Sequence, residues 1–179
     1  MPRVTGDNIQ TGYDATKHLI EHGHKHIGVI YGVFNVSSTN DRLEGYKTAL
    51  KENNISFQEN FLELGHATVA GGATAVDNLL KRDPTITALF IQNDLMTIGV
   101  ISQLKKLGIS IPNQIALIGF GDFASASIID PPITTIVQPS QRLGMLAFDT
   151  LMQRINHSGS IENHCLSASL IRRKSCGCH

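Results

Sequence analysis

Residues 111–139, with the sequence IPNQIALIGFGDFASASIIDPPITTIVQP, decide the fold of this chain. The apolar run IALIGF at 115–120 indicates a buried strand. A loop of small and polar residues follows, then the pair Pro131-Pro132, and then a second short strand pattern. Nearly continuous apolar strands are typical of a parallel sheet that helices cover on both faces. The stretch therefore predicts two strands of an α/β sheet.

Two further apolar runs, IGVIY at 27–31 and ALFIQ at 88–92, predict strands of the same kind. Helical patterns fill the spaces around these runs, up to about residue 22 and over about 40–52, 70–82 and 95–107. Three of the helices end at a glycine or before a proline, namely at Gly23, Asp83-Pro84 and Gly108. Strands that alternate with helices in this way imply right-handed crossovers. The predicted fold class is therefore α/β with a doubly wound parallel sheet.

Composition limits the functions open to the chain. Its 179 residues carry 15 basic and 15 acidic side chains, so no net field draws it toward nucleic acid or an anionic membrane. Apolar runs long enough to span a membrane are absent from the sequence, and the polar start MPRVTGDN does not resemble a signal peptide. We expect a cytoplasmic protein.

Polar side chains follow the predicted strands at the points where these end. Ser38 and Arg42 come after the first strand, Asn93 and Asp94 after the second, and Asp122 after the third. In open parallel sheets, ligands bind beyond the carboxyl ends of the strands. These side chains therefore predict a site that grips a polyhydroxylated or anionic small molecule, with Arg42 able to make a bidentate contact.

Simpler interpretations stay open for the same residues. Asn93 and Asp94 also suit the N-cap of the helix that they begin. Arg42 would pair equally well with Asp41 or Glu44 in solvent. The sequence contains no phosphate-binding loop, nucleophile elbow or metalloprotease motif, so we expect no catalytic residues and no enzyme activity.

The region after residue 139 has a different character. Residues 140–156 predict a long helix whose apolar residues cover more than half of its circumference, which implies partners on more than one side. The residues that we expect to make dimer or interlobe contacts are Leu143, Leu146, Phe148, Leu151 and Ile155. Alternation over 166–171 predicts a final strand.

Several motifs, in order along the chain, resemble the LacI/GalR family of bacterial transcription regulators. The opening VTGDNIQTGYDATKHLIEHGHKHIGVIYG resembles the family's crossover strand, first helix and following strand. RLEGYKTAL matches the helix that carries the effector-binding arginine, at Arg42, and NDLMTIGV matches the ligand-contacting pair, at Asn93 and Asp94. Residues 111–139 follow the family's order, and LIRRKSCG resembles its last strand. The resemblance covers about residues 4–177.

The resemblance implies the periplasmic-binding-protein-like type I fold, in which a ligand lies between two lobes. Residues 1–136 would form a nearly complete second lobe, 137–160 a strand and helix of the first lobe, and 161–179 the final strand and tail. Most of the first lobe and the helix-turn-helix head would then lie outside this chain. Gln138 matches a polar residue near the cleft and joins the expected ligand-binding set.

Two departures from the family pattern affect the expected pocket. Gly121-Asp122 stands where many members have two acidic residues, and His66, Ala67 and Thr68 stand where several have an aromatic platform. A pocket with Arg42 and fewer carboxylates favours an anionic ligand, such as a sugar acid or sugar phosphate.

We therefore expect an effector-sensing and dimerisation region of a LacI-type regulator, most plainly of the repressor kind. It would respond to a sugar or sugar derivative, and would contact operator DNA only through a head that this chain lacks. A stand-alone sugar-binding protein and a truncated product that only dimerises are the alternatives. If isolated, the chain is expected to dimerise or to exchange its apolar helix between copies.

The histidines and cysteines suggest no metal site at the level of the sequence, and no cofactor is expected. His18 and His22 share a helix face, but Gly23 ends that helix, and the family's turn accounts for His24. Cys176 and Cys178 are separated by one residue, which is tighter than the usual zinc-ligand spacing. A frayed tail is the expectation for the last four residues.

Overall fold

The computed structural model of this protein describes residues 2–121, 123, 125–156 and 162–178. Its core is a six-stranded sheet with the order β3-β2-β4-β5-β6-β8, in which only β8 runs antiparallel to its neighbour. The strands are β2 (Ile27–Tyr31), β3 (Leu62–Leu64), β4 (Ala88–Ile91), β5 (Ala116–Phe120), β6 (Thr134–Val137) and β8 (Ser169–Ile171). The predicted α/β fold with a doubly wound sheet is confirmed.

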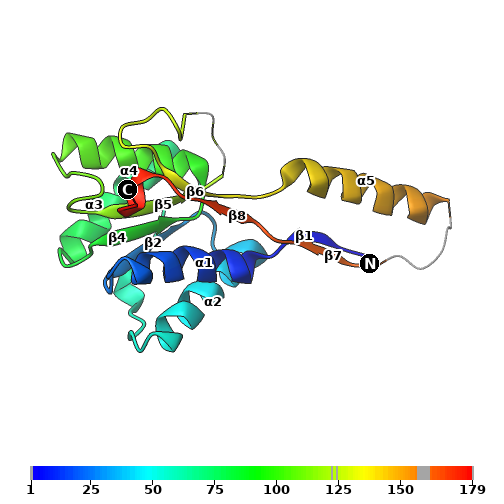
Figure 1. The fold of residues 1–179 in the computed structure, drawn as a ribbon, viewed down its shortest axis with the longest axis horizontal. Helices are drawn as coiled ribbons and strands as arrows, with labels where there is room; N and C mark the ends of the chain where they lie inside the picture. The colour runs from blue at the N-terminus through cyan, green and yellow to red at the C-terminus, as the bar shows by residue number, and fades with distance from the viewer. Residues whose placement is uncertain (1, 122, 124, 157–161, 179) are drawn as a thin grey trace.

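Two helix pairs cover the two faces of this sheet (Figure 1). Helices α1 (Asn8–Glu21) and α2 (Ser37–Glu52) lie on one face, and α3 (Val69–Arg82) and α4 (Asp94–Lys106) lie on the other. Strand side chains alternate between the faces, so Ala88 and Phe90 pack with the first pair and Leu89 and Ile91 with the second. This arrangement buries both faces and explains why the strands are apolar without interruption.

Each helix pair is held at close range by glycines. A β-carbon added to Gly12 of α1 would lie 2.0 Å from the carbonyl oxygen of Arg42 in α2. One added to Gly99 of α4 would lie 2.0 Å from the carbonyl oxygen of Val69 in α3. The backbones therefore approach more closely than any residue with a side chain would permit. At the α1–α2 crossing, this contact fixes the position of α2 relative to the sheet.

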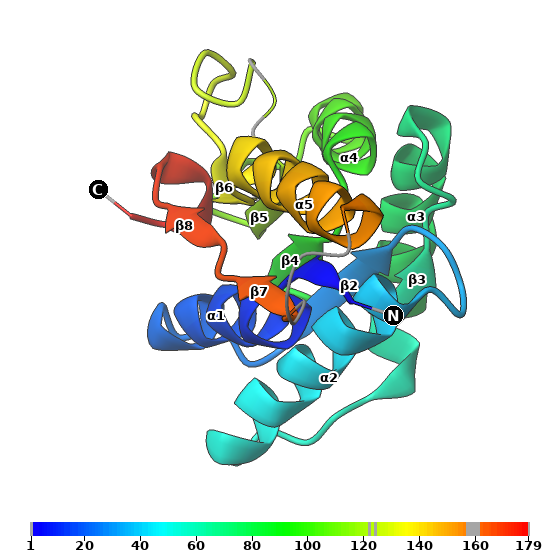
Figure 2. The same ribbon diagram turned by 90° about the vertical axis from the view of Figure 1, so that its right-hand side faces the viewer.

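A slender arm extends from the carboxyl edge of the sheet (Figures 1 and 2). It consists of β1 (Val4–Gly6), which pairs in parallel with β7 (His164–Leu166), and of helix α5 (Ser140–Ile155). The predicted single strand over 166–171 is wrong. The chain forms β7 in the arm and then β8 in the main sheet, because its path from one to the other is interrupted at residues 167–168.

Helix α5 leaves most of its apolar side chains in solvent. Phe148 is 61% exposed, Ile155 58% and Leu151 54%, while Leu143 and Leu146 are half-buried. Thr150 is the one α5 residue that is buried among those described. The sequence prediction that this helix needs partners beyond a single sheet stays a prediction, but its apolar surface is plain.

The carboxyl-terminal segment is packed, so the expectation of a frayed tail is wrong over its described residues. The short 3-10 helix η2 (Lys174–Cys176) has Ser175 and Cys176 fully buried. The Ser175 hydroxyl donates to the carbonyl of Leu117 in β5 at 2.8 Å and accepts from the amide of Thr134 in β6 at 2.8 Å. These bonds tie the tail to the amino-terminal ends of two core strands. His179 lies outside the described residues.

A second 3-10 helix, η1 (Glu59–Phe61), leads into β3. None of the helices in the described part of the chain has the length and apolar content that crossing a bilayer requires.

Candidate ligand-binding site at the carboxyl edge of the sheet

Arg42 is the centre of the carboxyl edge. It lies in the second turn of α2 and is only 9% exposed. Its Nη1 donates to the carbonyl oxygen of Gln92 at 2.9 Å, and its Nε donates to Oδ1 of Asn8 at 2.9 Å. The guanidinium lies over the ring of Phe120, 3.7 Å from its centroid. Three elements therefore hold this cation in one orientation, which is how a binding group is preorganised.

The charge of Arg42 has no anionic partner in the described part of the structure. Within these residues, its guanidinium forms no ion pair with a carboxylate, and its other N–H groups make no hydrogen bond. Burial lowers the pKa of Arg42 to about 10, although the nearby charge of Asp41 acts in the opposite direction. The group remains charged at neutral pH. A buried, uncompensated cation is costly, and an anionic or polar ligand would compensate it.

Asn93 and Asp94 begin α4 directly after β4. The side chain of Asn93 caps the helix by accepting from the amide of Met96 at 3.2 Å, and Asp94 accepts from the amide of Leu95 at 2.8 Å. Both residues are half-buried. The capping role that the sequence suggests is therefore present. Each carboxylate or amide oxygen has two lone-pair directions, so capping leaves capacity for a ligand.

The loop after β5 brings the third expected strand end close to this pair. A β-carbon on Gly121 would lie 3.2 Å from the Cβ of Asp94, and Gly121 has a φ of +100°, which favours glycine. Phe120, which stacks on Arg42, is the preceding residue. Asp122 lies outside the described residues. The structure therefore brings Arg42, Asn93 and Asp94 to one edge.

Ser38 and Gln138 lie at the margins of this group. Ser38 is half-buried in the first turn of α2, four residues before Arg42 and so on the same helix face. Gln138 follows β6 and packs against the arm, since a β-carbon on Gly6 would lie 2.5 Å from its Nε2. Gln138 therefore marks the junction between the sheet and the arm.

Three residues of the site went unnoticed in the sequence. Asn8 orients Arg42, Phe120 supports its guanidinium, and Gln92 supplies a carbonyl acceptor. The Gln92 side-chain amide is buried, and both of its polar atoms have no hydrogen-bond partner among the described residues. A signal existed for Gln92 and Phe120, because each is the last residue of an apolar strand run. Asn8 gave no signal, because its role depends on a contact across 34 residues.

Exposed apolar residues surround the polar group. After β2, Phe34 is 69% exposed and Val33 49%, and at the start of α4 Leu95 is 45% exposed. Pockets that bind small organic ligands are mainly apolar with a few placed polar groups. The carboxyl edge combines apolar and polar residues in this way, but its apolar residues are exposed to solvent.

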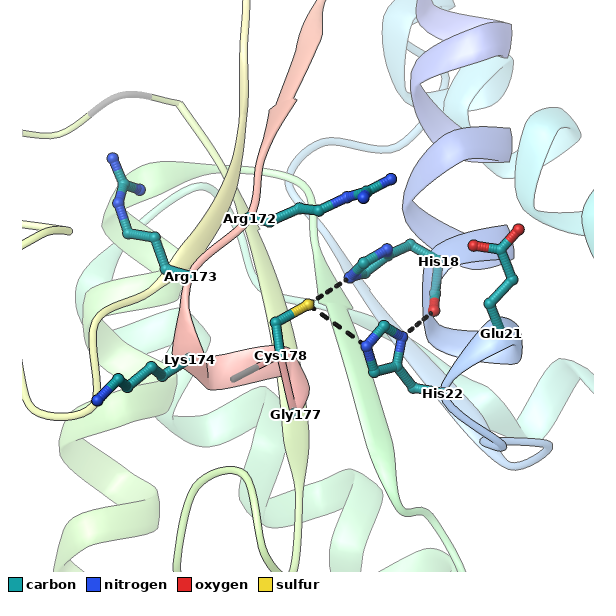
Figure 3. Close-up of a pocket in the computed structure, with 8 residues that line it drawn as sticks. All are labelled: His18, Glu21, His22, Arg172, Arg173, Lys174, Gly177 and Cys178. Atoms are coloured by element: carbon teal, nitrogen blue, oxygen red, sulfur yellow. Dashed lines mark hydrogen bonds between the residues drawn. The ribbon is translucent and has the colours of Figure 1, made fainter.

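The groups suited to metal binding lie at the opposite, amino edge of the sheet. His18 and His22 of α1 meet Cys176 and Cys178 of the tail there (Figure 3). His18, His22 and Cys178 border a cavity of about 690 Å³ that Glu21 and Arg172 also line, and Cys176 is buried behind it. Sequence reasoning set these four residues aside, and only the fold brings them together.

The chain matches a family model described as a periplasmic binding protein-like domain over residues 16–176. It is 36% identical over 153 residues to the HTH-type transcriptional repressor PurR of Actinobacillus pleuropneumoniae serotype 3, a match that covers 86% of this chain and 46% of the relative. It is 37% identical over 155 residues to the ribose operon repressor of Haemophilus influenzae, which covers 87% of this chain and 47% of that one.

Among solved structures, the transcriptional regulator CelR in complex with cellobiose superposes with a TM-score of 0.92 at 31% identity. That match covers 97% of this chain and 54% of the CelR chain. The chain thus spans about half the length of the curated relatives that it matches. These relatives are regulators and not enzymes, in agreement with the absence of catalytic motifs from the sequence.

Proposed function

The chain belongs to the periplasmic binding protein-like domain family, among relatives that are LacI-type transcriptional regulators, and we propose that it senses a small-molecule effector for such a regulator. In this proposal, it acts in the cytoplasm as part of a repressor and carries out no catalysis. Effector binding at the carboxyl edge changes the DNA affinity of a head that lies outside this chain.

The buried charge of Arg42 is the observation that carries the proposal. The ring of Phe120, the side chain of Asn8 and the carbonyl of Gln92 orient this guanidinium, yet no described carboxylate neutralises it. A structural arginine at this depth normally has a carboxylate partner. An arginine whose remaining donors have no partner in the described part of the chain is suited to a ligand.

The ligand class follows from the groups at this edge. Arg42 offers N–H donors in a fork that matches carboxylate and phosphate oxygens, and Asn93 and Asp94 offer acceptors for hydroxyl groups. Two of the relatives are described by a sugar, as a ribose operon repressor and as a cellobiose complex. We infer that the effector is a sugar or sugar derivative, with a sugar acid or sugar phosphate favoured because no carboxylate among the described residues pairs with Arg42.

A route from the effector to the rest of a regulator runs through Asn8. Its side chain accepts from Nε of Arg42 and donates to the carbonyl of Gly6, the last residue of β1. Gln138, which lies where the chain passes from β6 into the arm, packs on that same glycine. A ligand that shifts Arg42 would therefore act on two of the segments that connect the main sheet to the arm. This is a means to favour one lobe arrangement over another by population shift.

In this proposal, residues 1–136 form the second lobe except for β1 in the arm, 137–160 contribute helix α5 to the first lobe, and 161–179 return to the second through β7 and β8. The strand expected within 137–160 is instead β6, which ends at Val137 in the main sheet. The exposed α5 face then belongs against the first lobe or against a second copy of the chain. Phe148, Leu151 and Ile155 are 54–61% exposed, so burying what remains exposed contributes about 1–2 kcal/mol each, which favours association.

Self-association is tested by light scattering on the isolated 179-residue chain. We expect a dimer whose dissociation increases when Phe148 and Leu151 are both replaced by glutamate. A monodisperse wild-type monomer that binds no apolar dye would contradict the assignment of this face.

Effector binding is tested by thermal shift and calorimetry with ribose, cellobiose, gluconate and ribose 5-phosphate. At a ligand concentration about 100 times Kd, the Tm should rise by roughly 5–10 °C. The variant Arg42→Ala should weaken binding roughly 10–100-fold, because charged hydrogen bonds contribute about 1.5–3 kcal/mol.

Arg142→Ala provides the matched control, because it removes an exposed arginine from α5 and should leave the affinity unchanged. Equal affinity of the Arg42→Ala variant and the wild type would overturn the assigned site. Tight binding of a neutral sugar with no preference for the acid or phosphate would confine the proposal to the neutral class.

A further inference from the structure

Four side chains with soft or borderline donor atoms converge at the amino edge of the sheet. His18, His22, Cys176 and Cys178 each offer one ligand atom, and these four atoms all lie within 4.8 Å of one another. Figure 3 shows the imidazole rings of His18 and His22 pointing toward the sulfur of Cys178. The cluster is independent of the effector site, because the two lie at opposite ends of the strands.

Helix geometry places the two histidines. His18 and His22 are four residues apart, so their side chains lie on the same face, with ring centroids 4.4 Å apart. The predicted shared helix face is confirmed, and so is the helix end at Gly23, which has a φ of +89°. Helix α1 ends at Glu21, and His22, its C-cap, has a φ of −89° and a ψ of 10°, so its ring stays on the face of His18.

The tail places the two cysteines in spite of their short spacing. Gly177, between them, has a φ of +93° and reverses the chain at the end of η2. The two sulfur atoms therefore turn to the same side and lie 3.3 Å apart. The short spacing therefore does not keep the two sulfur atoms apart, because the left-handed Gly177 lets the backbone turn between them.

The distances inside the cluster are close to those around a tetrahedral ion. Nε2 of His18 lies 3.2 Å from the sulfur of Cys176 and 3.4 Å from that of Cys178, and Nε2 of His22 lies 3.3 Å from the sulfur of Cys178. Tetrahedral zinc with Zn–S of about 2.3 Å and Zn–N of about 2.0 Å separates nitrogen from sulfur by roughly 3.5 Å. To admit the ion, these short distances would expand by up to about half an ångström, and the atoms that are as much as 4.8 Å apart would move closer together.

Groups around the cluster orient two of the donors. Nδ1 of His22 lies 2.8 Å from the carbonyl oxygen of His18, and a carbonyl only accepts, so this nitrogen carries the proton. In the neutral ring, Nε2 then presents its lone pair toward Cys178. A second group, the Thr134 hydroxyl, lies 3.0 Å from the sulfur of Cys176. Outer contacts of this kind orient the ligands of metal sites.

We propose that His18, His22, Cys176 and Cys178 form a tetrahedral Zn²⁺ site that joins α1 to the carboxyl-terminal tail. Two thiolates and two neutral imidazoles give the bound ion a net charge of zero, which suits a partly buried location. His18 and Cys176 are buried, while His22 is exposed and Cys178 is half-buried. The ion would therefore enter from the cavity, where His22 and Cys178 are accessible.

The consequence for the molecule is a cross-link between distant parts of the chain. His18 and Cys176 are 158 residues apart in the sequence. The ion would fix the end of α1, whose start holds Arg42 through Asn8, against a tail that is already anchored to β5. With four protein ligands and no open position, the site is structural in type and not catalytic.

The test uses the full 179-residue chain, reduced with a phosphine and freed of metal by chelation. Titration with Co²⁺ should give one equivalent of bound ion, with the visible bands of a tetrahedral complex and the near-ultraviolet charge-transfer band of cobalt–thiolate bonds. Zn²⁺ should displace the cobalt. At a free zinc concentration about 100 times Kd, the Tm should rise by roughly 5–10 °C.

Variants at the exposed half of the cluster test the assignment without disturbing the core. Cys178→Ser and His22→Ala should each weaken Zn²⁺ binding by at least ~100-fold, because loss of a ligand exceeds the effect of losing an outer contact. Cys165→Ser and His24→Ala are matched controls. They remove a cysteine on β7 and a histidine that faces Thr87, and should leave the affinity unchanged.

Several outcomes would overturn the site. Cobalt spectra without a charge-transfer band, or a Tm that does not respond to zinc in the wild type, would show that the four groups only hydrogen-bond to one another. Equal losses in the control variants would show binding elsewhere on the chain. A failure of effector binding leaves each of these measurements unaffected, so the two proposals are tested separately.

Discussion

The two edges of the central sheet differ in how far their polar groups satisfy one another. At the carboxyl edge, Arg42 uses only part of its hydrogen-bonding capacity, and the amide of Gln92 has no partner among the described residues. At the amino edge, His18 and Cys178 contact each other and both of their neighbours in the cluster. Hydrogen-bonding groups without partners at an open surface suit a polar ligand that binds reversibly. Donor atoms that converge on a small space suit a permanently bound ion.

Helix α1 connects the two edges. It begins at the carboxyl edge, where Asn8 orients Arg42, and ends at the amino edge with His18 and His22. Strands of four or five residues at about 3.3 Å each separate the edges by roughly 15 Å. One helix can therefore support two unlike sites, provided that its packing on α2 and the sheet keeps both of its ends in place.

The largest effect is expected when this shared support is broken. Gly12→Ala places a β-carbon 2.0 Å from the carbonyl oxygen of Arg42, so α1 and α2 must separate. This overpacking should lower the free energy of unfolding by about 3 kcal/mol. In a helix with space around the glycine, replacement by alanine instead raises the free energy of unfolding by up to about 1 kcal/mol. Urea unfolding measures the change.

Gly144→Ala on α5 is the control for this substitution, because its added β-carbon would meet nothing within 4 Å. It should leave the stability equal or slightly higher. Both sites should weaken together in the Gly12→Ala variant. If this variant matches the wild type in its urea midpoint, the two edges do not depend on the α1–α2 crossing.

A smaller effect on stability is expected at the carboxyl edge itself. Arg42→Met keeps an unbranched apolar stem over Phe120 and removes a buried charge that no described carboxylate pairs with. Replacing such a charge by an apolar side chain is often neutral or stabilising, so the free energy of unfolding should change by less than about 1 kcal/mol, while sugar-phosphate binding weakens roughly 10–100-fold. A loss of more than about 3 kcal/mol would instead make Arg42 a structural residue.

The smallest effect sharpens the separation of the edges. Chelation of zinc should lower the Tm but leave the affinity for any stabilising member of the sugar panel within about two-fold. Groups more than about 10 Å apart that share no partner usually act additively. Calorimetry with and without chelator measures this directly. A ten-fold change in affinity on chelation would show that α1 transmits the state of one edge to the other.

The carboxyl edge was largely predictable from the sequence. Apolar runs locate the strands, and a parallel sheet gathers whatever follows each strand at one edge, so Arg42, Asn93 and Asp94 could be assigned to a common site. The orientation of Arg42 was not predictable. It depends on Asn8 and on the ring of Phe120, and both contacts arise from the packing of α2 against α1 and the sheet.

The amino edge shows the opposite case. Each of its four ligand candidates looked unsuitable in its local sequence, the histidines because of Gly23 and the cysteines because of their spacing. Local backbone geometry nevertheless brings the four groups together. His22 continues the face of α1, and the left-handed Gly177 turns the two cysteines to one side. No local pattern connects residue 18 with residue 176.

The sequence by itself determined the elements of this protein, their order and the face that each presents. This information is local, since it lies in apolar periodicity, helix caps and the glycines and prolines that end helices. Tertiary structure alone decided that the tail packs beneath β5 and β6 and that its cysteines meet the histidines of α1. It also decided how Arg42 is held. Such contacts depend on where the backbone returns after more than a hundred residues, and hydrophobic packing of the whole sheet sets that position.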